Sequence, residues 1–167
     1  ARRVRRRIQH GVGQDLLGGQ GKAGGKILEI CGSLASIPAH ERRDGFHEAF
    51  AGEPGVTFIG GLDGDWKLDR GKALAQDAFQ RHRDIDVVYA HNDPMAYGAY
   101  QAARELGMEG RVRFVGIDGL PGEGCVWVKN GILAATFLYP TPGERGLEIV
   151  LDILEGRRPV TPGEVIT

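Results

Sequence analysis

Short apolar runs alternate with longer amphipathic stretches along the chain after residue 24. The apolar runs are rich in Val, Ile, Leu and Phe and have the length of buried strands; they cover residues 26–31, 56–60, 86–90, 112–117 and 133–138. The stretches that follow them have helical length, and in one of them Leu74, Ala78 and Phe79 recur at the spacing of an amphipathic helix. Helices are therefore expected over residues 38–51, 68–83, 94–106, 122–130 and 142–155.

Regular alternation of strands and helices predicts βαβ units and a parallel sheet. Because crossovers between parallel strands are right-handed, the result is a doubly wound lobe. We expect an α/β fold of three layers, with a central, parallel five-stranded sheet, over residues 25–156. Residues 1–24 are a poorly defined basic and glycine-rich segment, in which a helix is one alternative, and residues 157–167 are expected to leave the lobe.

Length, charge and cysteine content exclude several classes of protein. The 167 residues suit one domain, and a formal net charge of −1 gives no global attraction to nucleic acid or an anionic membrane. No apolar run approaches the ~20 residues of a membrane helix, and the N-terminal ARRVRRRIQH does not have the pattern of a signal peptide. Cys31 and Cys125 are too few for a disulfide framework, and we expect no bridge between them.

The stretch DVVYAHNDP combines a predicted strand with the start of a predicted helix. Pro94 suits the first position of that helix, because its missing N–H would have no partner there. Asp93 is then the expected N-cap, with its carboxylate accepting from the first turn. These two assignments leave Asn92 without a local role.

Polar turns follow all five predicted strands. In an open parallel sheet, ligands bind at the carboxyl ends of the strands. The five turns here would share that edge of the sheet, and in chain order they read GSLASIPAHER, GLDGDW, HND, DGLPG and YPTPG. This arrangement predicts a binding site.

The side chains in these turns suit a ligand that is dense in hydroxyl groups. Asn92 offers two donors and an acceptor, and Asp118 offers acceptors only. Trp66 is a flat surface on which the apolar face of a sugar can stack. The remaining candidates are a second ring with a polar tip and two donors at the start of the first helix: Tyr139, His40 and Arg42.

Each candidate also has a purely structural interpretation, and sequence alone leaves both open. Asn92 and Asp118 can be ordinary turn residues that satisfy the backbone. Trp66 can pack against the following helix, and Tyr139 can be a plain loop residue. For His40 and Arg42 the alternative is a solvated helix face.

Motifs for catalysis and for phosphate binding are missing from the sequence. It has no GxGxxG after the first strand, no GxxxxGK[ST] loop, no GxSxG elbow and no HExxH pair. We therefore expect a binding protein rather than an enzyme, with no catalytic residue, no cofactor and no metal site.

Four stretches carry a resemblance to a known family: GKILEICGSLASIPAHERRDGF, DIDVVYAHNDPMAYGAYQA, RVRFVGIDGLPG and NGILAATFLYPTPG. In order and in motif they resemble the C-terminal lobe of periplasmic sugar-binding proteins of the ribose-binding type. Such proteins serve ABC importers, and related versions are sensor domains of membrane receptors. The ERRDGF motif is also similar to the effector-binding cores of LacI-type repressors.

The resemblance implies roles for the candidate residues. It implies that Asn92 and Asp118 bind sugar hydroxyls and that Trp66 stacks on the ligand. His40 stands where ribose-type members carry a sugar-binding arginine, and Tyr139 where they carry a glutamine, so the resemblance does not imply ribose itself. Arg42 matches a motif arginine.

The resemblance also implies the partners and the location of the protein. The expected ligand is a monosaccharide or polyol bound between two lobes, of which this chain holds one. The expected partner is the membrane permease of an ABC importer or a receptor, in the periplasm or another extracytoplasmic space, and not nucleic acid. The exposed edge of the cleft is an expected site of self-association. Two alternatives remain: the effector domain of a LacI-type regulator or receptor kinase, and a flavodoxin-like enzyme or nucleotide binder.

Overall fold

The computed structural model describes residues 24–139, 143–157 and 159. Within this part of the chain, five parallel strands form one sheet with the order β2-β1-β3-β4-β5. The strands are β1 (Gly24–Cys31), β2 (Gly55–Asp63), β3 (Val87–Ala90), β4 (Arg113–Asp118) and β5 (Ala135–Leu138). The helices are α2 (Ile37–Phe50), α3 (Leu68–Arg81), α4 (Asp93–Glu105), α5 (Gly124–Lys129) and α6 (Gly143–Leu154). The predicted α/β fold with a parallel five-stranded sheet is confirmed.

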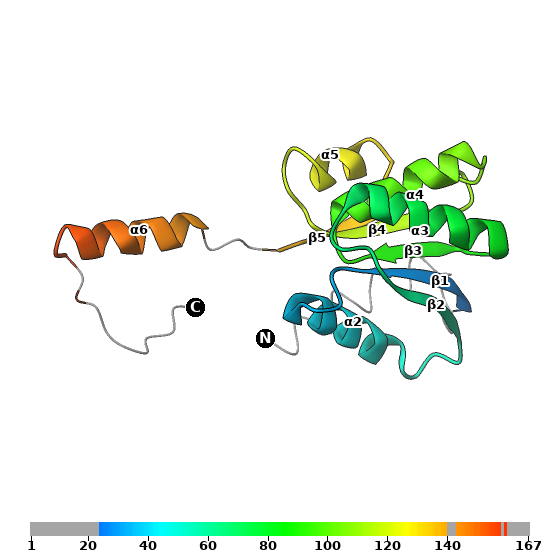
Figure 1. The fold of residues 1–167 in the computed structure, drawn as a ribbon, viewed down its shortest axis with the longest axis horizontal. Coiled ribbons are helices and arrows are strands. Elements are labelled where there is room, and N and C mark those ends of the chain that lie inside the picture. The colour runs from blue at the N-terminus through cyan, green and yellow to red at the C-terminus, as the bar shows by residue number, and fades with distance from the viewer. Residues whose placement is uncertain (1–23, 140–142, 158, 160–167) are drawn as a thin grey trace.

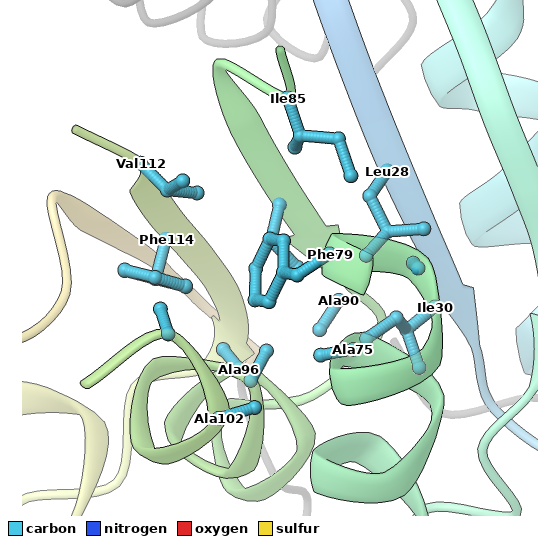
Figure 2. Packing of buried hydrophobic residues seen from close by; sticks show 14 of the residues in the cluster. Leu28, Ile30, Ala75, Phe79, Ile85, Ala90, Ala96, Ala102, Val112 and Phe114 are labelled. Atoms are coloured by element: carbon cyan, nitrogen blue, oxygen red, sulfur yellow. The ribbon is translucent and has the colours of Figure 1, made fainter. Parts of the chain in front are cut away.

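Helices cover both faces of the sheet (Figure 1). Side chains alternate along each strand, so Leu28 and Ile30 of β1 pack toward α3 and α4, whereas Ile27 packs toward α2. The larger core lies on the α3–α4 face and has Phe79 near its centre (Figure 2). The smaller core includes Phe50 and its neighbours on α2. These two cores account for the predicted three layers.

Glycines allow α3 and α4 to approach closely. A Cβ atom added at Gly71 would lie 2.7 Å from the carbonyl oxygen of Met95, closer than real Cβ contacts allow. A Cβ at Gly98 would likewise overlap the carbonyl oxygen of Leu68. The two helices therefore pack backbone against backbone.

The second strand is longer than predicted. It was expected over residues 56–60, but pairing with β1 continues to Asp63. Glu29 pairs with Gly60 and Ile30 with Leu62, so Gly61 is an extra residue in the ladder and has φ 73°. A bulge of this kind depends on glycine, whereas in the sequence the same glycines indicate a turn.

The predicted terminal segments, residues 1–24 and 157–167, and the helix considered within the first of them lie almost wholly outside the described residues. Within the described part, no helix is both long enough and apolar enough to span a bilayer. Cys31 and Cys125 are free thiols. Helix α6 lies apart from the sheet (Figure 1) and leaves several large apolar side chains exposed: Leu147, Val150, Leu151 and Leu154.

Candidate functional site

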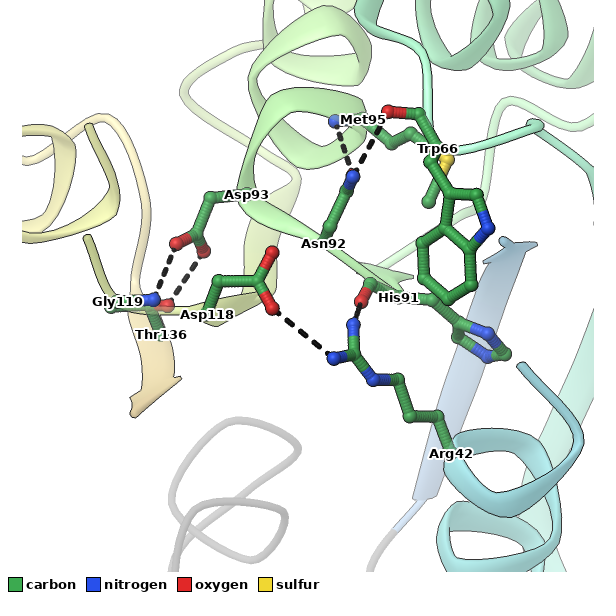
Figure 3. Close-up of polar contacts among 9 residues, drawn as sticks. All are labelled: Arg42, Trp66, His91, Asn92, Asp93, Met95, Asp118, Gly119 and Thr136. Atoms are coloured by element: carbon green, nitrogen blue, oxygen red, sulfur yellow. Dashed lines mark hydrogen bonds and ion pairs between the residues drawn. The ribbon is translucent and has the colours of Figure 1, made fainter. Parts of the chain in front are cut away.

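The carboxyl ends of the strands share one edge of the sheet, and most of the predicted site residues lie there (Figure 3). Asn92 is at the start of α4, and His40 is exposed on α2. Among the described residues, the His40 side chain makes no hydrogen bond, ion pair or ring contact with the other candidates. Contacts centred on one side chain bring together the remaining four: Arg42, Trp66, Asp118 and Tyr139.

Arg42 joins these residues. Its guanidinium donates to the main-chain carbonyl of His91 and, over 3.1 Å, to Oδ1 of Asp118. The guanidinium carbon also lies 5.2 Å from the ring centre of Trp66 and 5.0 Å from that of Tyr139. The Arg42 side chain is only 13% exposed, so it is a fixed part of this edge rather than a solvated residue of the helix face.

Asp118 ends β4 in an unusual backbone conformation. Its φ is 116°, a region that residues with a side chain rarely adopt. Strain of this kind concentrates at functional sites. Burial raises the pKa of the Asp118 carboxyl, although the charge and hydrogen bond of Arg42 oppose the shift. The side chain remains 30% exposed, so the carboxylate is within reach of a ligand.

Trp66 lies over the end of β1. Its backbone has φ 62°, and a Cβ atom added at Gly32 would overlap its ring. The ring also packs against the larger core while remaining partly exposed. Gly32 therefore provides the space for the indole, and Trp66 combines a packing role with an accessible surface at this edge.

Asn92, and not Asp93, is the N-cap of α4. Asn92 Oδ1 accepts from the backbone N–H of Met95 at 2.9 Å, and Nδ2 donates to the carbonyl of Trp66 at 2.9 Å. The amide is thus used twice within the protein, and the prediction that Asn92 is spared from capping is wrong. Its oxygen and its nitrogen each keep capacity for one more hydrogen bond.

Asp93 is buried, and its carboxylate binds residues of other segments rather than capping α4 as predicted. Its carboxylate accepts from the N–H of Gly119 at 2.8 Å and from the hydroxyl of Thr136 at 2.6 Å (Figure 3). Burial raises the pKa of Asp93, against the lowering effect of these two hydrogen bonds. Asp93 therefore ties the start of α4 to Gly119, directly after Asp118, and to Thr136 of β5.

A buried polar cluster on the α2 face of the sheet was not predicted. Glu29 Oε2 lies 2.8 Å from His47 Nε2, and Glu29 Oε1 lies 3.3 Å from His91 Nε2. Cys31 is on the same face of β1, and burial together with the charge of Glu29 raises the pKa of its thiol to about 12. The sequence signal was a charged residue inside the apolar run KILEIC, which is unusual for a buried strand.

Comparison with known proteins identifies the family. The profile of the periplasmic binding protein domain matches residues 9–158. The ribose import binding protein of Salmonella typhimurium is 32% identical over 149 residues, which are 88% of this chain and 49% of that protein. The D-allose-binding periplasmic protein of Escherichia coli is 35% identical over 136 residues, which are 79% of this chain and 43% of that protein.

A solved structure agrees with these relatives. The fructose-binding periplasmic domain of a hybrid two-component system superposes with a TM-score of 0.83 at 38% identity, and the match covers 99% of this chain and 54% of that one. The chain thus spans about half the length of the proteins it matches. All three are named as binding proteins or binding domains.

Proposed function

Since the chain belongs to the family of periplasmic binding protein domains, we propose that it forms one half of a cleft that binds a small sugar or polyol without catalysis. One observation carries the proposal. The guanidinium of Arg42 lies against the rings of both Trp66 and Tyr139 and beside the carboxylate of Asp118, at the carboxyl edge of the sheet.

The chemistry of this group suits a ligand with many hydroxyls. A guanidinium has five N–H donors, and Arg42 directs two hydrogen bonds to His91 and Asp118, so it has donors left for a ligand. Asp118 accepts only, and its carboxylate binds hydroxyl donors. Trp66 and Tyr139 present apolar ring faces, on which the C–H face of a sugar stacks. Tyr139 is 53% exposed, and its ring would be covered when the cleft closes.

A second lobe completes the cleft in this proposal. The matched relatives are about twice as long as this chain, and a lobe opposite Trp66 and Tyr139 would exclude water from the ligand. The same lobe would cover the apolar side chains exposed on α6: Leu147, Val150, Leu151 and Leu154. One lobe alone lacks about half of the ligand contacts, so its affinity should be millimolar or weaker.

The proposed role is that of the solute-binding component of an ABC sugar importer in an extracytoplasmic space. Two relatives carry the names of a ribose import binding protein and a periplasmic allose-binding protein. Ligand capture would shift the equilibrium between open and closed forms, and a membrane permease would respond to the closed form. No step in this role breaks or forms a covalent bond.

A sensor domain is the second candidate. The fructose-binding domain of a two-component system is 38% identical over 99% of this chain. In that case the partner is a receptor and the same closure drives a signal. Both roles use the same binding edge.

Ligand titration followed by NMR tests the binding proposal. The ¹⁵N-labelled chain is titrated with pentoses, hexoses and polyols to high millimolar concentration. We expect a saturable, selective shift of the amides around Trp66 and Asp118. Asp118→Asn should weaken binding at least about tenfold, because hydrogen bonds to charged groups contribute about 1.5–3 kcal/mol.

The control variant is Asp77→Asn, which removes an exposed carboxylate of α3 that pairs with Arg81. It should leave the titration unchanged. The proposed site is contradicted if Asp118→Asn binds the selected sugar with unchanged affinity. It is also contradicted if the amide shifts change with every sugar and do not saturate.

A further inference from the structure

The buried polar cluster on the α2 face of the sheet contains groups that the sugar-binding proposal does not use. Glu29 and Cys31 are two residues apart on β1, so their side chains share one face. Ala90, the last residue of β3, pairs with Ile30 between them, and His91 follows it directly. Three side chains with different ligand chemistry therefore converge on this face of the sheet.

Burial of these side chains is almost complete. Glu29 is 1% exposed, and Cys31 and His91 are 0% exposed. Buried polar groups are normally hydrogen-bonded, because an unpaired one destabilises the folded state. Yet His91 Nδ1 has no partner, and within the described ranges it is the single buried side-chain nitrogen or oxygen in this condition.

The contact between His91 and Glu29 shows how the ring can face an ion. His91 Nε2 lies 3.3 Å from Glu29 Oε1. When Nδ1 carries the proton of the neutral ring, the lone pair of Nε2 points toward the carboxylate. A cation between these two atoms would replace the hydrogen bond and bind both of them, since imidazole nitrogen and carboxylate oxygen are both ligands of zinc.

We propose that Glu29, Cys31 and His91 form a buried binding site for a divalent transition-metal ion of the zinc class. One ligand atom from each of the three side chains lies within 4.8 Å of the other two. Zinc binds to sulfur at about 2.3 Å and to nitrogen or oxygen at about 2.0–2.2 Å, so the three groups close around the ion with small side-chain movements.

Charge balance favours the same ion. A thiolate, a carboxylate and a neutral imidazole carry two negative charges, which a dication neutralises. A neutral site avoids the large cost of an unpaired charge in the interior. Binding displaces the proton of the Cys31 thiol to solvent. A mixed set of sulfur, nitrogen and oxygen ligands suits zinc better than calcium or magnesium, which take oxygen ligands.

His47 supports the site from α2. Its Nε2 lies 2.8 Å from Glu29 Oε2, so it holds the oxygen that His91 does not contact. Outer partners of this kind orient metal ligands and change affinity by about 10- to 100-fold. The metal site adjoins the sugar-binding edge, because Arg42 donates to the main-chain carbonyl of His91 and the His91 ring lies 6.5 Å, centre to centre, from that of Trp66.

Cobalt is the probe for the test, because Co²⁺ replaces zinc and absorbs light when a thiolate binds it. The 167-residue chain is stripped with chelator, checked for folding by circular dichroism and titrated with Co²⁺. We expect one ion per chain, a sulfur-to-cobalt charge-transfer band and the d–d bands of a four-coordinate ion, in which water supplies the fourth ligand. Added Zn²⁺ should remove both sets of bands.

Two matched serine variants locate the thiolate. Cys31→Ser should abolish the charge-transfer band, whereas Cys125→Ser, which changes the exposed thiol, should retain it. His91→Gln should weaken Co²⁺ binding at least about tenfold, and the charge-transfer band should still be present at saturation. With this second variant, the test of the site does not depend on the folding of Cys31→Ser alone.

Three results overturn the proposal. The first is the absence of stoichiometric Co²⁺ and Zn²⁺ binding by the folded chain. The second is binding without a charge-transfer band, which assigns the ion to surface histidines. The third is a band that survives Cys31→Ser and disappears in Cys125→Ser.

Discussion

Arg42 Nη2 lies 3.1 Å from Asp118 Oδ1, and this ion pair joins α2 to the end of β4 at the edge of the sheet. The two residues are 76 positions apart in the sequence. Because Arg42 also contacts Trp66 and Tyr139, the pair holds together the ends of segments that would otherwise meet only through the sheet. The arrangement of the candidate site therefore depends on Arg42.

Replacing Arg42 by lysine should destabilise the lobe. A lysine cannot reproduce the planar fork that bonds both the His91 carbonyl and Asp118, and it stacks less well on aromatic rings. We expect a loss of about 1–2 kcal/mol in the free energy of unfolding, measured by urea denaturation. Arg43→Lys, at the adjacent exposed position, should change it by less than about 0.5 kcal/mol. Equal effects of the two variants would contradict the assigned role.

The capping role of Asn92 makes a separate prediction. Asn92→Ala removes the N-cap of α4, which is worth about 1 kcal/mol, and the bond to the Trp66 carbonyl, worth about 1 kcal/mol more. Asn92→Ser keeps a capping oxygen but cannot reach Trp66, so it should recover about half of the loss. Thermal unfolding of both variants measures this order. A serine variant no more stable than the alanine variant would show that the cap contributes nothing.

Ionisation of Glu29 should make the free energy of unfolding depend on pH in the acid range. Burial alone would raise its pKa, but hydrogen bonds from His91 and His47 outweigh burial, and the pKa falls below the ordinary value of a glutamate. A carboxyl with a lowered pKa in the folded state stabilises the protein above its unfolded pKa, and this contribution is lost as pH falls through the folded pKa. The contribution of Glu29 to the stability should therefore decline below about pH 4.5.

Glu29→Gln should flatten that decline, because the side chain no longer titrates. Urea unfolding at pH values from 6 to 3 measures the difference between variant and wild type. Glu48→Gln, at an exposed position of α2, is the control and should keep the wild-type profile. If Glu29→Gln retains the full acid-dependent loss, another group is responsible for it.

Because α3 and α4 pack closely, an added methyl group where they cross should lower the stability of the protein. Gly71→Ala places a Cβ atom 2.7 Å from the Met95 carbonyl, and overpacking of this kind costs about 1–3 kcal/mol. Gly52→Ala is the matched control, since a Cβ atom there meets nothing within 4 Å. Chemical denaturation of both variants tests the contrast. A neutral Gly71→Ala would mean that the helices separate easily.

The local pattern of apolar and polar residues was sufficient to predict the strands of the sheet, but not where β2 ends. The runs that became β1, β3 and β4 are apolar and bounded by turn residues, so their positions depend on short-range sequence alone. The end of β2 was missed because its pairing passes through a bulge at Gly61, where the sequence indicates a turn.

The assignment of Asn92 and Asp93 failed by one residue for a physical reason. Either side chain can cap a helix, and the choice depends on what else is within reach. The Asp93 carboxylate instead accepts hydrogen bonds from Gly119 and Thr136, which are 26 and 43 positions later in the chain. Similarly, Glu29 was visible as an unusual charge in a strand, but its partner His91 is 62 positions away. Such pairings exist only once the sheet has formed.

Tryptophan fluorescence tests the central claim, that a sugar binds at the edge formed by Arg42, Trp66 and Asp118. Trp127→Phe leaves Trp66 as the single indole of the chain, and this variant is titrated with the sugar and polyol panel to high millimolar concentration. The account predicts a saturable, sugar-selective change in emission that is absent in Trp66→Phe. No change with any sugar, both in this chain and in a two-lobed chain that includes it, would contradict the account.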